Sequence, residues 1–490
     1  MHLHFVGIGG SGMSGLARLC AARGDRVTGS DRRPDRGPAA TLCADGFSVT
    51  ADDTPLPPGV EQVVVTAAIP EDHPQRLAAE AAGLPVIKYA AMLGRLMAEP
   101  GREGVAVAGT HGKSTTTVLL CHALATAGLD PSAIVGAASP LLARGGSGSG
   151  SGAGSARAVG FRVGAGRLLL AEACEFDRSF HRLSPRHLVV LNLEADHLDC
   201  YGNEARLAEA FAHLSGLLPA DGTLLVNADN IHTPAMVEAA GCAASGVATY
   251  AAGSAARRDA VDWYLHVSPG CWRLRGPGVE VAWTPPNGPG WSGLHMAWNA
   301  AAAAATALRL GASTHAVSAA MATARPPVRR LDPRGTHRGV QIVDDYAHHP
   351  TELKATLLAL RAGLTPNGRL GCVFQPHQHA RTRLLMDGFA ESFGHADVVW
   401  VCDIYAARDT AADTAAVSSA ELVRRLRKRG VSAHHTPTLE DAAAAASRAL
   451  HAGDTLAALG AGDVDAVIPL FRSHPGQTTP PGGSAGDAKP

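Results

Sequence analysis

The sequence predicts an α/β protein of three domains, each built around a mainly parallel sheet. The 490 residues are too many for one core, because domains average about 150 residues. Short apolar runs alternate with helical stretches along most of the chain, which is typical of parallel sheets. Two glycine-rich turns each follow an apolar run and begin a helical stretch, and turns of that kind bind phosphates.

The first predicted domain, residues 1–99, opens with a βαβ unit. A strand over residues 3–8 leads into a glycine-rich turn, a helix follows to about Arg23, and a second strand ends at Asp31. A diphosphate from NAD or from a UDP-sugar would fit such a turn, with Asp31 near a ribose. A turn that binds no ligand is the alternative. The turn contains Gly9, Gly10, Ser11 and Gly12.

The second predicted domain, residues 100–325, begins with the strongest motif in the chain. A strand over residues 105–108 runs directly into a loop and then into a helix. Glycines let backbone N–H groups approach phosphates, Lys113 can bind terminal phosphates, and Ser114 can hold Mg²⁺. The alternative is a glycine turn with an exposed lysine. The predicted phosphate loop consists of Gly109, Thr110, His111, Gly112, Lys113, Ser114 and Thr115.

Acidic residues follow two later strands of this domain. Glu172 comes directly after a strand over residues 168–171, and Asp196, His197 and Asp199 follow a strand over residues 188–191. Because the carboxyl ends of parallel strands meet at one edge, a phosphate-bound Mg²⁺ could recruit one of these side chains. A solvated acidic loop is the alternative.

Composition marks the remaining segments. Residues of about 144–158 are rich in glycine and serine and predict a flexible surface insert, since they cannot bury enough surface to become ordered. Residues 474–490 predict a disordered tail. The third predicted domain spans residues 326–473, and its strands are expected at residues 340–344, 370–375, 398–403 and 455–460.

Histidines and arginines follow two strands of the third domain. Tyr346 and His348 come after the first of them, and His377 and Arg381 come after the second. Such a cluster at the carboxyl edge of a sheet would suit an anionic substrate and an amine, although a single loop histidine is more often merely solvated. In the second domain, Asn299 lies in the first turns of an alanine-rich helix and could face a nucleotide base or support the turn.

These motifs, in this order, resemble the Mur ligase family over about residues 2–472. The opening His-Phe-Val-Gly-Ile-Gly-Gly-Ser-Gly-Met-Ser-Gly-Leu-Ala, residues 4–17, is similar to the branch that joins L-alanine to UDP-N-acetylmuramate. The other motifs are Gly-Thr-His-Gly-Lys-Ser-Thr-Thr-Thr at 109–117, Asn-Leu-Glu-Ala-Asp-His-Leu-Asp at 192–199, Asp-Asp-Tyr-Ala-His-His-Pro-Thr-Glu at 344–352, Phe-Gln-Pro-His at 374–377 and Leu-Gly-Ala-Gly-Asp at 459–463.

The resemblance implies an N-terminal Rossmann-like UDP-binding domain, a central P-loop-type ATPase domain and a C-terminal Rossmann-like domain. It implies that the UDP-sugar is bound by Gly9, Gly10, Ser11, Gly12 and Asp31. It implies that ATP is bound by residues 109–115, Asn299, Arg330 and Asp344. A metal would be held by Ser114, Glu172 and His197. The amino acid and the reacting carboxyl would meet Tyr346, His348, His377 and Arg381. The expected catalytic residues are Lys113, His197 and His348.

The resemblance also implies the reaction and its setting. The lactyl carboxyl of UDP-N-acetylmuramate would attack ATP in the presence of Mg²⁺, and L-alanine would then displace phosphate from the acyl phosphate to form an amide. Such an enzyme would serve peptidoglycan precursor synthesis in the cytoplasm. The alternatives are a ligase for a recycled peptide, a paralogue with another acceptor or a nucleotide sensor, and an NAD-dependent oxidoreductase. The chain departs from the family pattern at Cys174, Phe176, Met296, Leu331 and Gln378.

Composition excludes several other classes of protein. Lys and Arg number 43 and Asp and Glu number 44, so no net field would attract nucleic acid or an anionic membrane. No run of about 18 strongly apolar residues predicts membrane insertion. The nine cysteines form no C-x-x-C pair, which argues against a structural zinc or a secreted disulfide scaffold. The sequence leaves the oligomeric state open.

Overall fold

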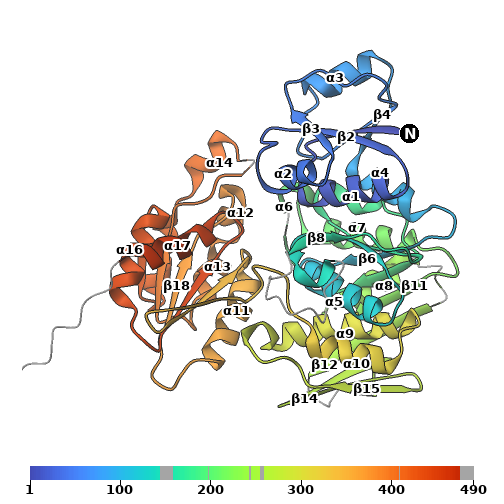
Figure 1. Ribbon diagram of the computed structural model, residues 1–490. Helices are drawn as coiled ribbons and strands as arrows, with labels where there is room; N and C mark the ends of the chain where they lie inside the picture. Colours follow the sequence, from blue (N-terminus) through green and yellow to red (C-terminus); the bar gives the residue numbers. More distant parts are fainter. Residues whose placement is uncertain are drawn as a thin grey trace, which may run out of the picture. The chain divides into compact units, whose positions relative to one another are not determined.

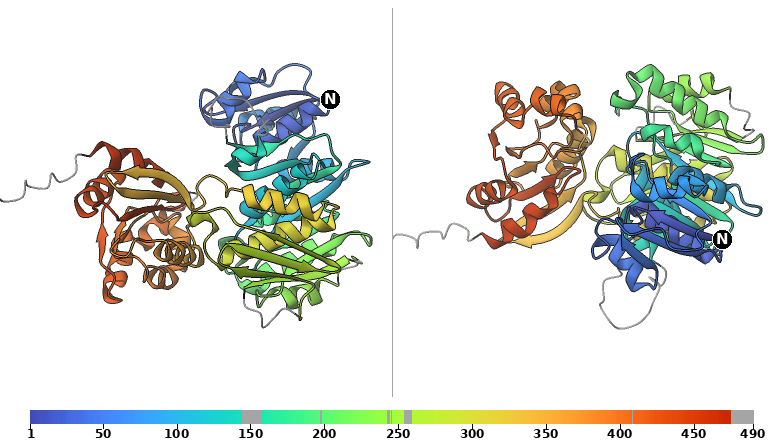
Figure 2. Two further views of the ribbon diagram at one scale, coloured as in Figure 1. Left: turned by 60° about the horizontal axis from the view of Figure 1, so that its bottom comes forward. Right: turned by 90° about the horizontal axis from the view of Figure 1, so that it is seen from above.

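The computed structural model divides into two compact units, Met1–Val328 and Arg329–Pro490, and each is an α/β unit (Figure 1; Figure 2). No helix of the described chain is long and apolar enough to cross a membrane. Most of the predicted Gly/Ser insert, all but one residue of the predicted tail, and His197 lie outside the described residues. The structure describes residues 1–143, 158–196, 198–241, 244, 246–253, 259–407 and 409–474.

The first sheet has five parallel strands in the order β3-β2-β1-β4-β5. Every residue of the central strand β1 is buried, as expected for a parallel sheet covered by helices. The predicted βαβ unit is confirmed. The strands are β1 (His2–Val6), β2 (Arg26–Asp31), β3 (Ser48–Ala51), β4 (Gln62–Val65) and β5 (Val86–Lys88), and the helices are α1 (Ser11–Ala22), α2 (Gly37–Ala44), α3 (Pro74–Ala81) and α4 (Tyr89–Met97).

The second sheet has ten strands in the order β15-β14-β13-β12-β11-β10-β6-β9-β7-β8. Its middle strands are parallel, as predicted. The sequence analysis missed the antiparallel additions at the two edges, where β14 pairs with β13 and β15, and β8 pairs with β7. The strands are β6 (Glu103–Ala108), β7 (Ser132–Ser139), β8 (Val159–Arg162), β9 (Leu168–Glu172), β10 (His187–Val190), β11 (Thr223–Asn227), β12 (Gly246–Gly253), β13 (Trp263–Ser268), β14 (Cys271–Gly276) and β15 (Val279–Trp283).

Within the described residues, six α-helices accompany this sheet. Ala300 through Ala305 on α9 are fully buried, and α9 packs against α5 and β12. Their small side chains let the neighbouring elements approach closely. The predicted alanine-rich helix is confirmed, and its position in the core was not predicted. The helices are α5 (Lys113–Thr126), α6 (Leu198–Tyr201), α7 (Glu204–Gly216), α8 (Thr233–Ala240), α9 (Leu294–Arg309) and α10 (Thr314–Thr323), with 3₁₀ turns η1 (Pro140–Leu142), η2 (Phe176–Arg182) and η4 (Pro289–Trp291).

The first two sheets belong to one unit because α1 packs against β7 and β8. A Cβ on Gly15 of α1 would lie only 3.0 Å from the Cβ of Phe161 on β8. The guanidinium of Arg18 lies 4.5 Å from the centre of the Phe161 ring. Leu16 of α1 and Ile134 of β7 share one buried apolar cluster. The N-terminal glycine turn and the central sheet are therefore fixed relative to each other.

The second unit contains the third sheet, whose order is β16-β17-β21-β18-β19-β20. All pairs are parallel except β16 with β17, and the four predicted strands are present. The strands are β16 (Asp332–His337), β17 (Val340–Asp345), β18 (Leu370–Phe374), β19 (Val398–Val401), β20 (Ala433–His435) and β21 (Thr455–Leu459). The helices are α11 (Pro350–Ala362), α12 (His379–Leu384), α13 (Met386–Ser392), α14 (Ala411–Ala416), α15 (Ser419–Lys428), α16 (Leu439–Ala449) and α17 (Val467–Ser473), with a 3₁₀ turn η5 (Val464–Ala466).

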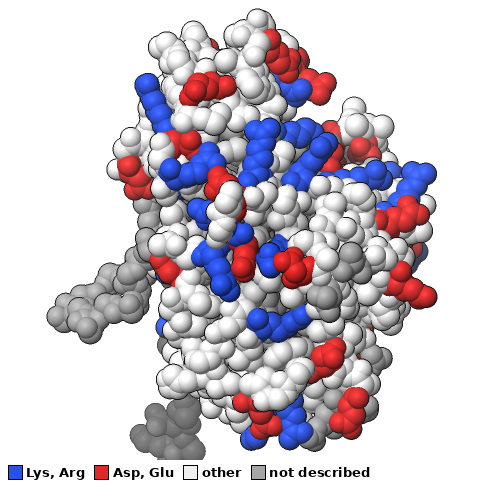
Figure 3. All heavy atoms as spheres, turned by 90° about the vertical axis from the view of Figure 1, so that its right-hand side faces the viewer, with Lys and Arg blue, Asp and Glu red and all other residues white. Residues whose placement is uncertain are grey.

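Both signs of charge occur side by side on the face of the molecule drawn in Figure 3. This mixture agrees with the formal net charge of −1. The boundaries predicted at residues 99/100 and 325/326 stay predictions. The first sheet is complete with β5 and its last helix α4 ends at Met97, and the second sheet begins at Glu103.

Acid should weaken the first sheet through His4. This side chain is 1% exposed, and its Nδ1 lies 2.9 Å from the hydroxyl of Thr28. Burial lowers the pKa of His4 from 6.5 to about 4; a hydrogen bond with Gln75 opposes that shift and His2 adds to it. The unfolded histidine takes up a proton below pH 6.5 while the folded one stays neutral. The stability contribution is therefore complete above pH 6.5 and is lost as the pH falls toward 4.

In this window we expect the free energy of unfolding to fall by up to about 1.4 kcal/mol per pH unit. Amide exchange of β1 and β2 peptides, corrected for the intrinsic effect of pH, would measure it. The variant His4→Gln should show a flatter dependence because it removes the titrating group. Equal pH dependence in the two proteins would contradict a role for His4.

Candidate functional site

The site of the first unit begins at the carboxyl edge of the second sheet. Strand β6 lies between β9 and β10, and all three are parallel. The register pairs Val107 with Glu172 and Ala108 with Val190. The chain therefore leaves all three strands at one edge, where the predicted phosphate loop and the predicted metal ligand Glu172 meet.

The phosphate loop packs against Asn299. Gly112 has a φ of 85°, and a Cβ there would lie 2.3 Å from the Asn299 Oδ1. The hydroxyl of Thr116 donates to the same oxygen at 3.3 Å. Asn299 is 8% exposed. The structure thus brings Asn299 to the loop, while its predicted contact with the nucleotide base stays a prediction.

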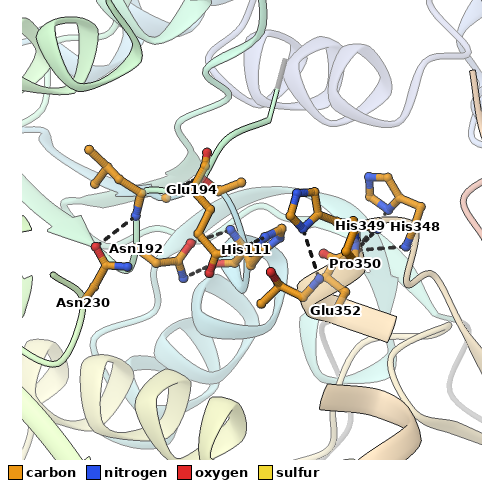
Figure 4. Close-up of polar contacts among 12 residues, drawn as sticks. His111, Asn192, Glu194, Asn230, His348, His349, Pro350 and Glu352 are labelled. Carbon is orange, nitrogen blue, oxygen red and sulfur yellow. Dashed lines mark hydrogen bonds and ion pairs between the residues drawn. The ribbon is translucent and has the colours of Figure 1, made fainter. Parts of the chain in front are cut away.

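The loop is also tied to the segment that follows β10 (Figure 4). The His111 N–H donates to the Asn192 Oδ1 at 2.8 Å, and the Asn192 Nδ2 donates back to the His111 carbonyl at 3.0 Å. The Glu194 N–H donates to the Thr110 hydroxyl at 2.9 Å. The His111 Nε2 lies 3.5 Å from a carboxylate oxygen of Glu194. Asn192 and Glu194 were visible as parts of a motif, but their clamping role was not predicted.

Lys113 is held by a carboxylate that the sequence analysis did not select. Its Nζ lies 2.8 and 3.0 Å from the two carboxylate oxygens of Glu175. It also donates to the carbonyls of Gly109 at 2.6 Å and Thr110 at 3.1 Å. Burial opposes the charge of Lys113, but Glu175, with smaller contributions from Cys174 and Glu172, raises the pKa of the ammonium on balance. The signal for Glu175 was its position three residues after Glu172, which alone did not indicate a pairing.

The structure describes two of the three predicted metal ligands, Ser114 and Glu172. Ser114 lies in the first turn of α5 and is 7% exposed. Glu172 accepts a hydrogen bond from the Gly136 N–H at 2.6 Å. His197 lies outside the described residues. A hydroxyl and a carboxylate at one strand edge fit a hard cation such as Mg²⁺, which prefers oxygen ligands.

The N-terminal glycine turn is fastened by Asp31. The Gly9 N–H donates to the Asp31 Oδ2 at 2.8 Å, so this carboxylate shapes the turn, and its predicted role near the nucleoside stays a prediction. Gly10 is the N-cap of α1 and provides no side-chain cap. A Cβ on Gly12 would lie 2.8 Å from the Tyr89 hydroxyl. Burial raises the pKa of Tyr89, with smaller contributions from Glu172 and Cys174.

Tyr89 therefore lies between the glycine turn and the carboxyl edge of the central sheet. Glu172, whose carboxylate contributes to the raised pKa of the Tyr89 hydroxyl, lies at the end of β9 at that edge. Burial also raises the pKa of the Cys174 thiol to about 11, so the thiol stays protonated and this departure from the family pattern adds no nucleophile. The sequence analysis did not select Tyr89, because its contacts come from segments far from it in the chain.

The two arginines after Val328 have different surroundings in the second unit. Arg329 donates to the Gly460 carbonyl at 2.8 Å and to the Gly462 carbonyl at 2.9 Å. Arg330 lies over the Tyr346 ring at 5.2 Å, and its side chain is 26% exposed. Arg329 is thus part of the framework, and Arg330 lies 3.8 Å from a carboxylate oxygen of Glu352. Its predicted role beside adenine is not tested by these contacts.

Asp344 is fully buried and paired with cations. Its Oδ1 lies 3.3 Å from the Arg329 Nε, and its Oδ2 lies 3.0 Å from Arg334. Burial raises the pKa of Asp344 to about 6, although Arg329 and Arg334 oppose that shift. Both oxygens already have protein partners, so the observed role of Asp344 is structural. Its predicted contact with the nucleotide stays a prediction.

The predicted amino-acid site comes together in the second unit. The rings of Tyr346 and His348 are 5.3 Å apart, and those of His348 and His377 are 6.4 Å apart. An Arg381 nitrogen lies 3.5 Å from the His377 Nδ1. Tyr405, which the sequence analysis did not select, stacks on His377 at 5.5 Å. Four side chains from two distant motifs are therefore neighbours.

Glu352 organises one side of this group (Figure 4). Its Oε2 accepts the His348 N–H at 3.0 Å and lies 3.2 Å from the His348 Nδ1. His349 is the N-cap of α11, and Pro350 begins the helix as predicted. The orientation of His348 is thus fixed by the helix start.

A strand, a glycine-rich loop and a helix at the carboxyl edge of a parallel sheet are the arrangement typical of phosphate-binding domains. Three family models match the chain: the Mur ligase family catalytic domain over residues 2–100, the Mur ligase middle domain over 107–307, and the Mur ligase glutamate ligase domain over 329–462. The chain belongs to the Mur ligase family. The predicted three-domain α/β class and the predicted family are confirmed.

Two relatives that are similar in sequence carry the same name. The UDP-N-acetylmuramate–L-alanine ligase of Lachnospira eligens is 34% identical over 472 residues, covering 95% of this chain and 96% of its own. The ligase of that name from Arthrobacter sp. is 40% identical over 412 residues, with 83% and 82% covered.

Two solved structures share the fold over nearly the whole chain. The UDP-N-acetylmuramate–alanine ligase of Thermotoga maritima has a TM-score of 0.73 at 23% identity, with 96% of this chain and 98% of that chain covered. The murein peptide ligase of Psychrobacter arcticus has a TM-score of 0.67 at 22% identity, with 97% and 99% covered. Since the two are named for different acceptors, the fold alone does not decide the acceptor.

A methyl group at Gly112 should disrupt the phosphate loop. The Cβ would lie 2.3 Å from the Asn299 Oδ1, so either the loop or Asn299 must move. We expect Gly112→Ala to weaken ADP binding about tenfold or more, because the loop N–H groups lose their arrangement. Titration calorimetry on the full chain would measure this.

Gly128→Ala is the matched control. Gly128 also has a positive φ, 78°, and follows the other end of α5, but a Cβ there would meet no described heavy atom within 4 Å apart from its chain neighbours. It should lower stability slightly and leave ADP binding unchanged. Equal losses of affinity in both variants would refute the contact with Asn299 as the cause.

Proposed function

We propose that this chain is an ATP-dependent ligase that joins L-alanine to the lactyl carboxyl of UDP-N-acetylmuramate. The observation that carries the proposal is the phosphate loop, with its largely buried Lys113, in the same compact unit as the N-terminal glycine turn. The name shared by the two relatives from Lachnospira eligens and Arthrobacter sp. supports the proposal, since these relatives are 34% and 40% identical to this chain. We also propose a cytoplasmic location, because ATP is available there.

Activation of the carboxyl is the first step. A carboxylate oxygen of the lactyl group attacks the γ-phosphorus of ATP, and the bond to ADP breaks, which leaves an acyl phosphate. Catalysis of phosphoryl transfer is mainly positioning and charge neutralisation. Lys113 supplies a fixed cation and the loop N–H groups supply dipoles. Ser114 and Glu172, together with His197, would hold Mg²⁺, which neutralises phosphate charge when bound.

Amide formation is the second step. The unprotonated amine of L-alanine attacks the acyl carbon, phosphate leaves with the bonding electron pair, and the nitrogen loses a proton. The imidazole nitrogens of His348 or His377 would accept that proton, since histidine is a common general base. Arg381 supplies a cation for a carboxylate. The second unit thus carries the groups that we assign to the amino acid.

The proposal is tested by product formation. The full chain is given ATP, Mg²⁺ and UDP-N-acetylmuramate with L-alanine, glycine, L-serine or a tripeptide, and phosphate and product mass are measured. Release that depends on L-alanine, with a product heavier by one alanyl residue, is the expected result. Activity only with the tripeptide would instead identify a peptide-recycling ligase. Lys113→Met should lower kcat by about a thousandfold and serves as the negative control.

Substitution of the proposed metal ligand should change the metal dependence. Glu172→Gln keeps an acceptor for the Gly136 N–H, which donates at 2.6 Å, but removes the negative charge. We expect the Mg²⁺ concentration for half-maximal activity to rise about tenfold at saturating ATP, because a neutral amide is a weaker ligand. Glu209→Gln, on the exposed side of α7, is the control. An unchanged Mg²⁺ dependence would remove Glu172 from the metal site.

A further inference from the structure

The ammonium of Lys113 already has a full set of protein partners. Two carboxylate oxygens of Glu175 lie at 2.8 and 3.0 Å, and the Gly109 and Thr110 carbonyls lie at 2.6 and 3.1 Å. A lysine has three N–H donors, so each of them is engaged. The side chains of Lys113 and Glu175 are 15% and 3% exposed. A nucleotide phosphate can reach this ammonium only by replacing one of these partners.

Two hydrogen bonds to the backbone carbonyl of Glu175 hold this residue in place. The Tyr201 hydroxyl donates to the Glu175 carbonyl, and the Arg178 N–H donates to the same oxygen at 2.9 Å. The chain then turns through Asp177 and Arg178, whose φ angles are 55° and 50°. Those left-handed conformations are unfavourable for residues with side chains. The fold therefore accepts local strain in the segment that delivers this carboxylate to the lysine.

We propose that Glu175 is a positioning residue that takes the place of the nucleotide phosphates on Lys113 while the loop is empty, and that ATP must displace it. This inference rests on the proposed function, since it takes ATP to bind at the loop. Of the Lys113 partners named above, the Glu175 carboxylate is the one that is negatively charged, as a phosphate is. It is therefore the partner that competes with the nucleotide for the same ammonium.

Two consequences follow from this competition. While the site is empty, a buried lysine without Glu175 would be a poorly compensated charge, and removing one member of a buried pair is strongly destabilising. When a nucleotide enters, its phosphates compensate Lys113, and the Glu175 carboxylate becomes a like charge beside them. The pair thus stabilises the empty enzyme and lowers its affinity for nucleotide.

The variant Glu175→Gln tests this directly in the full chain, without UDP-N-acetylmuramate or L-alanine. We expect ADP and ATP to bind about tenfold more tightly, because the amide competes less well for Lys113. The Tm of the empty variant should be lower than that of the wild type, and the rise in Tm on adding ADP should be larger. A residue that served stability alone would lower Tm without tightening nucleotide binding.

Two further variants keep the test decisive. Glu175→Asp retains the charge but shortens the side chain, so we expect a smaller tightening of the same sign, also measurable if Glu175→Gln does not fold. Glu209→Gln, on exposed α7 surface, should leave both measurements unchanged. Unaltered or weaker ADP binding in a folded Glu175 variant overturns the inference alone. A wild-type chain that binds neither nucleotide refutes the proposed function as well.

Discussion

The parallel pairing of β6 with β9 and β10 is the constraint on which the site depends. Hydrogen bonds between the strands fix the register of Val107 with Glu172 and of Ala108 with Val190. Because all three strands run in one direction, their carboxyl ends form one edge. The phosphate loop, the proposed metal ligand and the Asn192–Glu194 segment all lie at that edge. A shift in register would separate groups that now lie within hydrogen-bonding distance.

Packing between the first two sheets extends this edge to the N-terminal glycine turn. Helix α1 lies on β7 and β8, and its first turn carries Gly12, which has room only for hydrogen because Tyr89 lies so close. The turn proposed for a diphosphate and the loop proposed for ATP are thus parts of one compact unit. The side chains assigned to the amino acid all belong to the second unit, which begins after Val328.

Charges in both units are balanced locally instead of by the chain as a whole. Lys113 is matched by Glu175, and the fully buried Asp344 is matched by Arg329 and Arg334. A buried charge without such a partner would be unfavourable. The two adjacent arginines follow the same rule, since Arg329 pairs with Asp344 and Arg330 lies 3.8 Å from Glu352.

The sequence by itself determined the class of fold, the family, most strands and the position of the phosphate loop, because these depend on local periodicity and on short motifs. It did not reveal the antiparallel edge β13–β15, the pairing of Glu175 with Lys113 or the position of Tyr89. Lys113 and Glu175 are 62 positions apart, and Tyr89 meets Gly12 from another helix. Such contacts depend on strand register and helix packing across long separations, so only the tertiary structure decided which of several plausible side chains meet.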